Sequence, residues 1–272
     1  MIVKILNYIL IPLLASAMVG CDAIASRIDR TIGDAMSQVD YNSPSYPDLD
    51  MVKTDDSMPS QVKRYEGFLL SFNRQNHTPN WVAWELLASE LVDNVSRSNN
   101  FWQDDDIAGC PRHSDYTRSG YDRGHMIPAA DQKRSLRAME DCFVMANMCP
   151  QNGSLNSGAW NTLEEKCRAW AKRDSSIVIV AGPIYMPSDT QCIGETQVRV
   201  PSAFFKTIIA PYAASPRGIA FIYPNMPSPG DMKNYVVTID YVEEITGYDL
   251  YYNLPDEIER EIERTSSFND WK

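Results

Sequence analysis

The run IVIV, residues 177–180, constrains the fold more than any other part of this sequence. It lies within "SSIVIVAGPIY", residues 175–185, where β-branched apolar residues follow one another without a polar interruption. A short apolar run of this kind predicts a fully buried strand, and the Gly182-Pro183 pair is expected to end it. The fold must therefore be built around a sheet.

Other apolar segments predict the remaining strands. "GFLLSFN" (67–73) is expected to be the first strand, "AFFKTIIAP" (203–211) and "GIAFIYPN" (218–225) later ones, and "KNYVVTIDYVEEITG" (233–247) a strand that runs into a helix. "PNWVAWELLASEL" (79–91) fits a strand or a helix by its pattern. Strands separated by loops, with a few helices between them, predict an α+β fold and no repeating βαβ unit.

One helix is predicted clearly, over residues 155–174. Its apolar positions recur at helical spacing and form one stripe: Leu155, Ala159, Leu163, Cys167 and Trp170. Ser154 is the expected N-cap. Asn156 then falls in the first turn, where an isolated asparagine is more often a capping or surface residue than a ligand.

The N-terminus has the pattern of a cleaved export signal. Lys4 precedes an apolar run from Ile5 to Val19, which is short for a membrane span. Gly20 and Cys21 then resemble a bacterial lipobox, in which the cysteine is acylated. Residues 1–20 are thus predicted to be a lipoprotein signal peptide, with an ordinary secretory signal as the alternative. Either signal places the mature protein outside the cytoplasm. With the lipoprotein signal, the acylated Cys21 would anchor it to the membrane of the cell envelope.

Residues 21–61 are predicted to be a flexible tether, and the folded domain is expected over residues 62–272. The segment "YNSPSYPDLDMVKTDDSMPS" (41–60) is rich in Pro, Ser and Asp and has no apolar period. Five cysteines follow Cys21, so at least one has no partner within the chain, and the sequence leaves the pairing open. They are Cys110, Cys142, Cys149, Cys167 and Cys192.

The formal net charge of −11 taken alone argues against a nucleic-acid partner. The charge is unevenly distributed, however. Residues 97–173 contain eleven Lys and Arg against ten Asp and Glu, so the acidic excess lies toward the two ends. A polyanion is therefore permitted at the middle of the chain.

The segment "YDRGHMIPAAD" (121–131) contains His125, one of only three histidines. Downstream come "NMCPQ" (147–151), "LNSGAW" (155–160) and "LEE" (163–165). In this order the motifs resemble the DNA/RNA non-specific endonucleases of the ββα-metal class, the group that includes endonuclease G. The resemblance covers most of the predicted domain, including "PNWVAWEL", "AGPIY", "VPSAFFK" and "ITGYDLYYNLP". It implies an α+β, ββα-metal fold whose central, mostly antiparallel sheet is flanked by helices.

The resemblance also implies roles for individual residues. His125 would be the general base that takes a proton from water. Asn156 would be the direct protein ligand of one Mg²⁺ ion, with Mn²⁺ as a possible substitute, and Glu164 would hold the waters of the metal. The implied substrates are DNA and RNA.

Three further residues follow from the same resemblance. Arg123 and Arg97 would contact the phosphate, and Asn147 would lie in the same site. "SRSNNFW" around Arg97 matches the family only loosely. Asp122 is expected to order the strand rather than to react.

Elementary chemistry supports these roles. A neutral histidine near its ordinary pKa can act as a base at physiological pH. Mg²⁺ keeps several waters and binds few protein groups, and arginines give bidentate contacts to phosphate. Asn156 and Glu164 lie eight residues apart, roughly 12 Å along an ideal helix. The two residues therefore cannot both bind one ion directly from a regular helix. Either Asn156 lies before the helix proper or Glu164 acts through water, and we expect the second, alone or together with the first.

Other readings stay open at this point. An inactive, nucleic-acid-binding lipoprotein on the same scaffold is the main alternative, and a phosphodiesterase that acts on other esters is a third. His113 is expected to be a surface loop residue. The pair Phe101-Trp102 is expected in the core, and Lys133, Arg134 and Arg137 on a solvated face. The oligomeric state, the membrane leaflet and any preference for DNA or RNA are not specified by the sequence.

Overall fold

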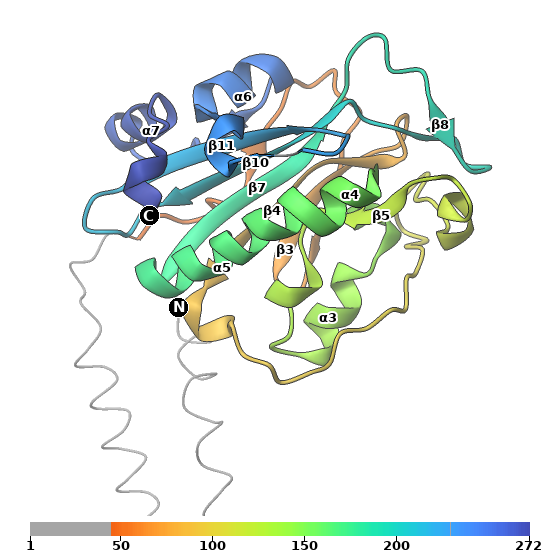
Figure 1. Cartoon of the computed structure of the whole chain (residues 1–272), viewed down its shortest axis with the longest axis horizontal. Helices are drawn as coiled ribbons and strands as arrows, with labels where there is room; N and C mark the ends of the chain where they lie inside the picture. Colours follow the sequence, from red (N-terminus) through yellow and green to blue (C-terminus); the bar gives the residue numbers. More distant parts are fainter. Residues whose placement is uncertain (1–44, 229) are drawn as a thin grey trace, which may run out of the picture. The chain divides into compact units, whose positions relative to one another are not determined.

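The predicted buried strand is β7 (Ser176–Ile184), and all of its residues are buried. The computed structural model describes residues 45–228 and 230–272. The predicted signal peptide, Cys21 and most of the predicted tether lie outside the described residues. Within them, β7 is the middle strand of a seven-stranded sheet (Figure 1).

Every neighbouring pair of strands in this sheet is antiparallel. The strand order is β12-β11-β10-β7-β4-β3-β2. The bounds in that order are β12 (Val236–Val237), β11 (Arg217–Pro224), β10 (Ala203–Ala210), β7, β4 (Thr78–Leu87), β3 (Phe68–Asn73) and β2 (Gln61–Tyr65). The central antiparallel sheet expected from the sequence is therefore confirmed, and β4 resolves the ambiguous segment as a strand.

Helices cover both faces of the sheet (Figure 1). Ile177 and Ile179 of β7 belong to one core, which includes apolar residues of α5 (Asn161–Asp174). Val178 and Val180 point into a second core, shared with α6 (Ile239–Thr246) and α7 (Asp256–Glu263). An antiparallel strand usually alternates apolar and polar residues, so this double coverage explains the unbroken apolar run.

The Gly-Pro pair does not end β7, contrary to the expectation. Gly182 and Pro183 pair with Phe205 and Phe204 of β10. The pairing with β4 stops at Ala181, so Pro183 stands where β7 has become an edge on that side. A proline lacks a backbone donor and is tolerated at such an edge.

The folded part begins earlier than the predicted boundary at Val62. Residues 46–272 form one compact unit. Strand β1 (Val52–Lys53) pairs with β13 (Asp249–Leu250), and Leu49 and Val52 are buried. The local Pro- and Asp-rich composition does not predict this strand, because β1 is stabilised by a partner strand almost 200 residues later in the sequence. The tether prediction is therefore wrong for residues 46–61.

The remaining elements are short. They comprise α3 (Leu136–Cys142), α4 (Gly153–Leu155), the ribbon of β5 (Asp122–His125) and β6 (Met148–Gln151), the ribbon of β8 (Cys192–Ile193) and β9 (Val198–Arg199), and the 3-10 helices η2 (Ala88–Glu90), η3 (His113–Tyr116), η4 (Ala129–Asp131), η5 (Met145–Asn147), η7 (Met232–Tyr235) and η8 (Phe268–Trp271). All five described cysteines are free thiols. Over the described ranges, no helix combines the length and apolar character needed to cross a membrane.

Candidate active site

The motif DRGH forms strand β5, which pairs with β6 in an antiparallel ribbon. In this register His125 lies opposite Met148, and Gly124 lies opposite Cys149. A Cβ atom on Gly124 would come within 2.3 Å of the Gln151 side chain. Glycine is therefore required at this position by the close approach of the two strands.

The chain leaves β6 and enters an interrupted helix, which completes a β-β-α arrangement. The helix starts as α4, passes through the π-helical segment η6 (Asn156–Trp160) and continues as α5. Gly158 inside η6 has non-helical angles (φ −106°, ψ −107°) and kinks the axis. Asn152 caps the start, since its side chain accepts hydrogen bonds from the Ser154 and Leu155 amides. The predicted cap at Ser154 is thus two residues too late.

The kink lies between Asn156 and Glu164, the two residues of the predicted metal site. Asn156 precedes α5, whereas Glu164 lies in its first turn. The two side chains line the same cavity, of about 700 Å³. The break at Gly158 lies between them, so they do not project from one regular helix.

Five of the six predicted catalytic and metal-site residues line this cavity: Arg97, Arg123, His125, Asn156 and Glu164. Asn147 does not. It is fully buried, and its amide bonds to the backbone of Ile127 and Cys142 at 2.8–3.1 Å. The two contacts to Ile127 fix the loop after His125, and the contact to Cys142 ties it to the end of α3. Asn147 therefore supports the site and is not free to meet a substrate.

His125 packs edge-on against Phe143 and at a tilt against Phe101. Its ring centroid lies 4.8 Å from that of Phe143 and 5.7 Å from that of Phe101. Its Nε2 atom is buried and has no hydrogen-bond partner in the protein. A buried polar atom without a partner is costly, which points to a ligand or water as its partner in the working site.

Burial, followed by the guanidinium charges of Arg97 and Arg123, lowers the pKa of His125 to about 3. A hydrogen bond to the Arg123 backbone acts in the opposite direction. The expectation of an ordinary histidine pKa is therefore wrong for the free protein. The imidazole is neutral at every pH near neutrality and can accept a proton.

The same two phenylalanines orient the two arginines. The guanidinium of Arg97 lies 5.2 Å from the Phe143 ring centroid, and that of Arg123 lies 4.9 Å from the Phe101 centroid. These cation–π contacts hold both positive charges at the wall of the cavity that His125 lines. The loosely matched Arg97 is therefore brought to the same place as Arg123.

Asn156 is oriented by Asp122. Its Nδ2 donates a hydrogen bond of 3.0 Å to Asp122 Oδ2. This contact fixes which end of the amide is the donor, so the carbonyl oxygen is left as an acceptor beside the cavity. Asp122, expected to order its strand, also holds Asn156 of the following helical segment.

Glu164 is almost buried, with 9% of its surface exposed. Burial raises its pKa to about 7, against the opposing effect of the Lys206 charge, and Asp131 raises it further. Lys206 is itself fully buried and lies 4.2 Å from the Trp160 ring centroid. The carboxyl of Glu164 thus changes its charge near neutral pH, which suits a group that holds water or cations.

Two residues of the cavity wall escaped the sequence analysis. His113 is exposed, but it lines the cavity, and its ring centroid lies 5.5 Å from that of Phe101. Burial, and then the Arg123 charge, lowers the pKa of His113. Phe101 packs against the main core as expected, but it also lines the cavity between the two histidines. Loop residues show no periodicity, so no pattern in the sequence marked either one.

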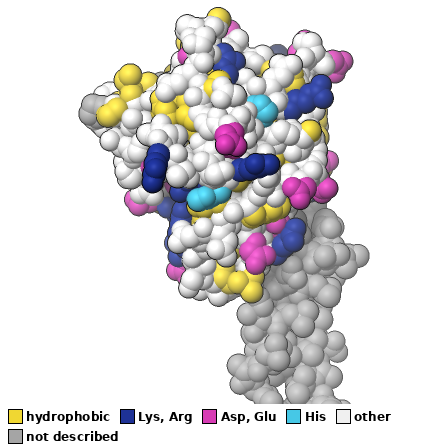
Figure 2. Space-filling model, turned by 90° about the vertical axis from the view of Figure 1, so that its right-hand side faces the viewer, with side chains coloured by type: hydrophobic (Ala, Val, Ile, Leu, Met, Phe, Trp, Pro, Cys, Tyr) yellow, Lys and Arg dark blue, Asp and Glu magenta, His cyan; other side chains and the backbone are white. Residues whose placement is uncertain are grey.

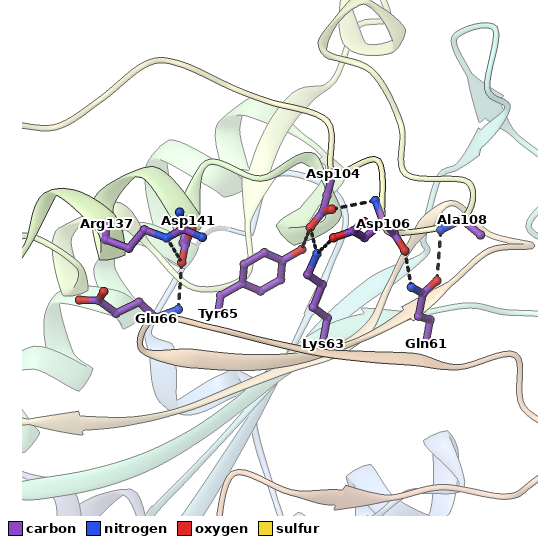
Figure 3. Close-up of polar contacts among 9 residues, drawn as sticks. All are labelled: Gln61, Lys63, Tyr65, Glu66, Asp104, Asp106, Ala108, Arg137 and Asp141. Carbon is purple, nitrogen blue, oxygen red and sulfur yellow. Dashed lines mark hydrogen bonds and ion pairs between the residues drawn. The ribbon is translucent and has the colours of Figure 1, made fainter. Parts of the chain in front are cut away.

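The loop that carries Phe101 is fastened to the edge strand β2 (Figure 3). Asp104 accepts a hydrogen bond of 2.5 Å from the Tyr65 hydroxyl and forms an ion pair of 2.7 Å with Lys63. Gln61 bonds to the backbone of Asp106 and Ala108 at 2.6 and 3.1 Å. The position of Phe101, and hence of Arg123, depends on this anchoring.

The face around the ribbon carries mixed charge (Figure 2). Histidine side chains lie beside both basic and acidic ones, with no continuous basic surface. Lys133, Arg134 and Arg137 pair with Asp93, Glu90 and Asp141. These three cations do not line the cavity. Arg137 is exposed as expected of a solvated face, whereas Arg134 is largely covered.

Residues 47–257 match the family model described as DNA/RNA non-specific endonuclease. The chain belongs to this family. The match covers the whole ββα arrangement and the sheet behind it. A solved structure, titled as the EndoG/EndoGI complex and the mechanism of EndoG inhibition, has a TM-score of 0.69 and 29% identity over 77% of this chain and 91% of that one. The ββα-metal fold expected from the sequence is confirmed.

Relatives of this nuclease-family chain come from distant organisms. The mitochondrial nuclease of Saccharomyces cerevisiae is 37% identical over 218 residues, which cover 71% of this chain and 66% of that protein. A nuclease of Nostoc sp. is 35% identical and covers 72% and 75%. Human endonuclease G, a mitochondrial protein, is 30% identical and covers 69% and 68%. The chain spans just under two thirds of the yeast relative.

Proposed function

We propose that this chain is a divalent-metal-dependent endonuclease that hydrolyses phosphodiester bonds of DNA and RNA. The observation that carries the proposal is the cavity in which a neutral histidine, two arginines and a fixed asparagine oxygen converge. The names of the relatives, all of them nucleases, support the same reaction.

His125 acts as the general base in this proposal. Its unpartnered Nε2 is the acceptor for a proton of the attacking water. A bound phosphate would offset the charges of Arg97 and Arg123, which contribute to the low pKa of His125. The substrate would thereby increase the basicity of the imidazole that takes the proton from the attacking water.

The side chains present fit a hard divalent cation. Asn156 offers a neutral oxygen whose orientation Asp122 fixes, and Glu164 offers a carboxyl that ionises near pH 7. Asn156 would hold Mg²⁺, or Mn²⁺, and Glu164 would hold its waters. When bound, such an ion supplies charge stabilisation at the phosphate and at the leaving oxygen.

Recognition in this proposal is by the phosphate backbone. The arginines aligned by Phe101 and Phe143 suit bidentate contacts to phosphate oxygens. Contacts to phosphate carry no sequence information, so we expect cleavage with little base preference. DNA and RNA share this group, and both are expected to be substrates.

Incubation of the purified protein with plasmid DNA and with structured RNA, in Mg²⁺ or in EDTA, tests the proposal. Cleavage of both polymers that EDTA abolishes is the expected result. Binding without cleavage would instead support the inactive lipoprotein. Hydrolysis of small phosphodiesters with neither polymer cut would support the third reading.

We also propose that the protein is exported and anchored by an acylated Cys21. The support is the sequence alone: Lys4, the apolar run from Ile5 to Val19, and Gly20-Cys21. An acyl chain with a tether would keep the nuclease at the cell envelope. Cys21→Ser should move the protein out of the membrane fraction or block its processing. Unchanged partition without incorporated lipid label would contradict the anchor.

A further inference from the structure

A second group of acidic residues lies away from the nuclease cavity, where α6 and α7 cover the other face of the sheet (Figure 1). Asp240 and Glu243 stand almost one turn apart on α6, and Glu263 is the last residue of α7. Each offers a carboxylate oxygen, and the three oxygens all lie within 4.8 Å of one another. We call these three residues the α6–α7 cluster.

Glu263 shows that the α6–α7 cluster is more than a charged surface. Only 7% of its surface is exposed, and its Oε1 atom is buried without a hydrogen-bond partner. Among the described residues, none of the three cluster carboxylates forms an ion pair with Lys, Arg or His. A buried carboxylate without a partner costs several kcal/mol in order of magnitude, so its oxygen requires one.

Glu243 is fixed in the position of a ligand. Its Oε1 accepts a hydrogen bond of 2.6 Å from the Leu250 amide on β13. That contact orients the carboxylate and leaves its second oxygen available. Asp240 is exposed and leaves the cluster open to water on one side.

The surroundings add further negative charge. Burial, followed by Glu243, Glu259, Asp240 and Asp249, raises the pKa of Glu263 to about 9. Burial, opposed by the Leu250 hydrogen bond, and then the neighbouring carboxylates raise the pKa of Glu243 to about 7. The groups that face the cluster are thus acidic on α6, α7 and β13 alike. Retained protons or a bound cation are the two ways to relieve this repulsion.

We propose that the α6–α7 cluster binds a divalent cation, with Ca²⁺ as the ion whose chemistry fits it. Ca²⁺ takes carboxylate oxygens at about 2.3–2.6 Å, so two ligands on opposite sides of the ion are about 5 Å apart. Oxygens within 4.8 Å of one another meet that requirement without movement. Mg²⁺ demands near-ideal octahedral geometry and keeps most of its waters, so a set of carboxylates from two helices suits Ca²⁺ better. Water completes the coordination on the Asp240 side.

The site has a structural consequence. The ion would join α6 to α7, and through Glu243 it would also hold β13, which pairs with β1. Binding would therefore stabilise the two ends of the folded unit together. The nuclease cavity lies beside the other core, so this cation is separate from the one that Asn156 is proposed to hold.

Calorimetry and thermal unfolding of the chelated protein with CaCl₂ test the proposal. The experiment uses the Asn156→Ala chain, so that the nuclease site does not contribute. We expect binding by about 1 mM Ca²⁺, the range of weak extracellular modules, and a rise in Tm that grows with concentration. Binding should release protons at pH 7, because Glu263 gives up its proton. Titrations in two buffers with different ionisation enthalpies measure that release.

Matched variants make the test specific to the α6–α7 cluster. Glu263→Gln and Asp240→Asn should abolish the Ca²⁺-dependent rise in Tm. Glu259→Gln, an acidic neighbour on α7 outside the cluster, should retain it. Glu263→Gln removes a costly carboxylate and should be at least as stable as the parent without Ca²⁺. Should it not fold, Asp240→Asn, at an exposed position, gives the same readout.

Two results would overturn the proposal. One is the absence of heat and of a Tm change up to about 1 mM Ca²⁺, with stability that responds to pH alone. This would mean that the three carboxyls only share protons. The other is an equal response of Glu263→Gln and Glu259→Gln, which would place the ion elsewhere.

Discussion

The pair formed by Asn156 and Asp122 allows the sharpest test of the nuclease site. In Asn156→Asp, the amide that donates to Asp122 Oδ2 at 3.0 Å becomes a carboxylate. Two unit charges 3.0 Å apart repel by about 1.4 kcal/mol in water-like surroundings and by about 5.5 kcal/mol at an effective dielectric constant of 20. Asp122 is exposed, so the lower figure applies.

The lost hydrogen bond adds about 1 kcal/mol. We therefore expect Asn156→Asp to lower the free energy of unfolding by about 2 kcal/mol in EDTA, measured by urea denaturation. Turnover of plasmid DNA should also fall, because a negative charge at this position repels the phosphate. A tenfold loss of turnover corresponds to about 1.4 kcal/mol.

The swapped pair, Asp122→Asn with Asn156→Asp, separates the two effects. It restores one amide and one carboxylate, so stability should return to within about 1 kcal/mol of the parent. Turnover should stay at least about tenfold low, since the neutral oxygen is still missing from position 156. Recovery of both stability and turnover in the swap would refute the reasoning. It would show that Asn156 and Asp122 form a structural pair only.

Three other perturbations have defined outcomes. His125→Ala should lower kcat about 10²- to 10⁴-fold and leave the Tm near that of the parent, as steady-state plasmid assays and thermal unfolding would show; near-normal turnover would remove the base assignment. Glu164→Gln should be less active but up to about 3 kcal/mol more stable at pH 8. Because the pKa of Glu164 is raised to about 7 in the folded protein, the parent loses stability as the pH rises from 4.5 to 7, and the variant does not. Equal urea midpoints at pH 8 would argue against this. Asp104→Asn should cost about 1–3 kcal/mol at pH 7. Burial acts to raise the pKa of Asp104, but hydrogen bonds from Lys63 and Tyr65 lower it overall. The contribution of ionised Asp104 to the free energy of unfolding is therefore complete above pH 3.8 and is lost as the pH falls through the lower pKa of the folded protein. The difference in stability between parent and variant should vanish in acid.

Much of the sheet was predictable because it depends on local pattern. The apolar run of β7 and the ordered motifs around His125 identified the central strand and the ββα unit. Features that depend on distant partners were not predictable in this way. The pairing of β1 with β13 extended the domain to residue 46, against the local composition.

The site shows the same division between local and distant information. His125, Arg123 and Asn156 were found through motifs, but the break at Gly158, which lies between Asn156 and Glu164, has no signal in the helical stripe. His113 reaches the cavity from the first residue of the short 3-10 helix η3, so only the folded chain reveals it. The sequence likewise does not predict that Lys206, in an otherwise apolar strand, is fully buried.

The contact of β1 with β13 has a consequence for the order of folding. Val52 pairs with Leu250, so the first strand of the unit can pair only with a segment almost 200 residues later in the sequence. Contacts of such long sequence separation form late and slow the reaction. Until residues 249–250 are in place, the first strand of the unit has no partner, so a fragment that lacks them would leave β1 unpaired.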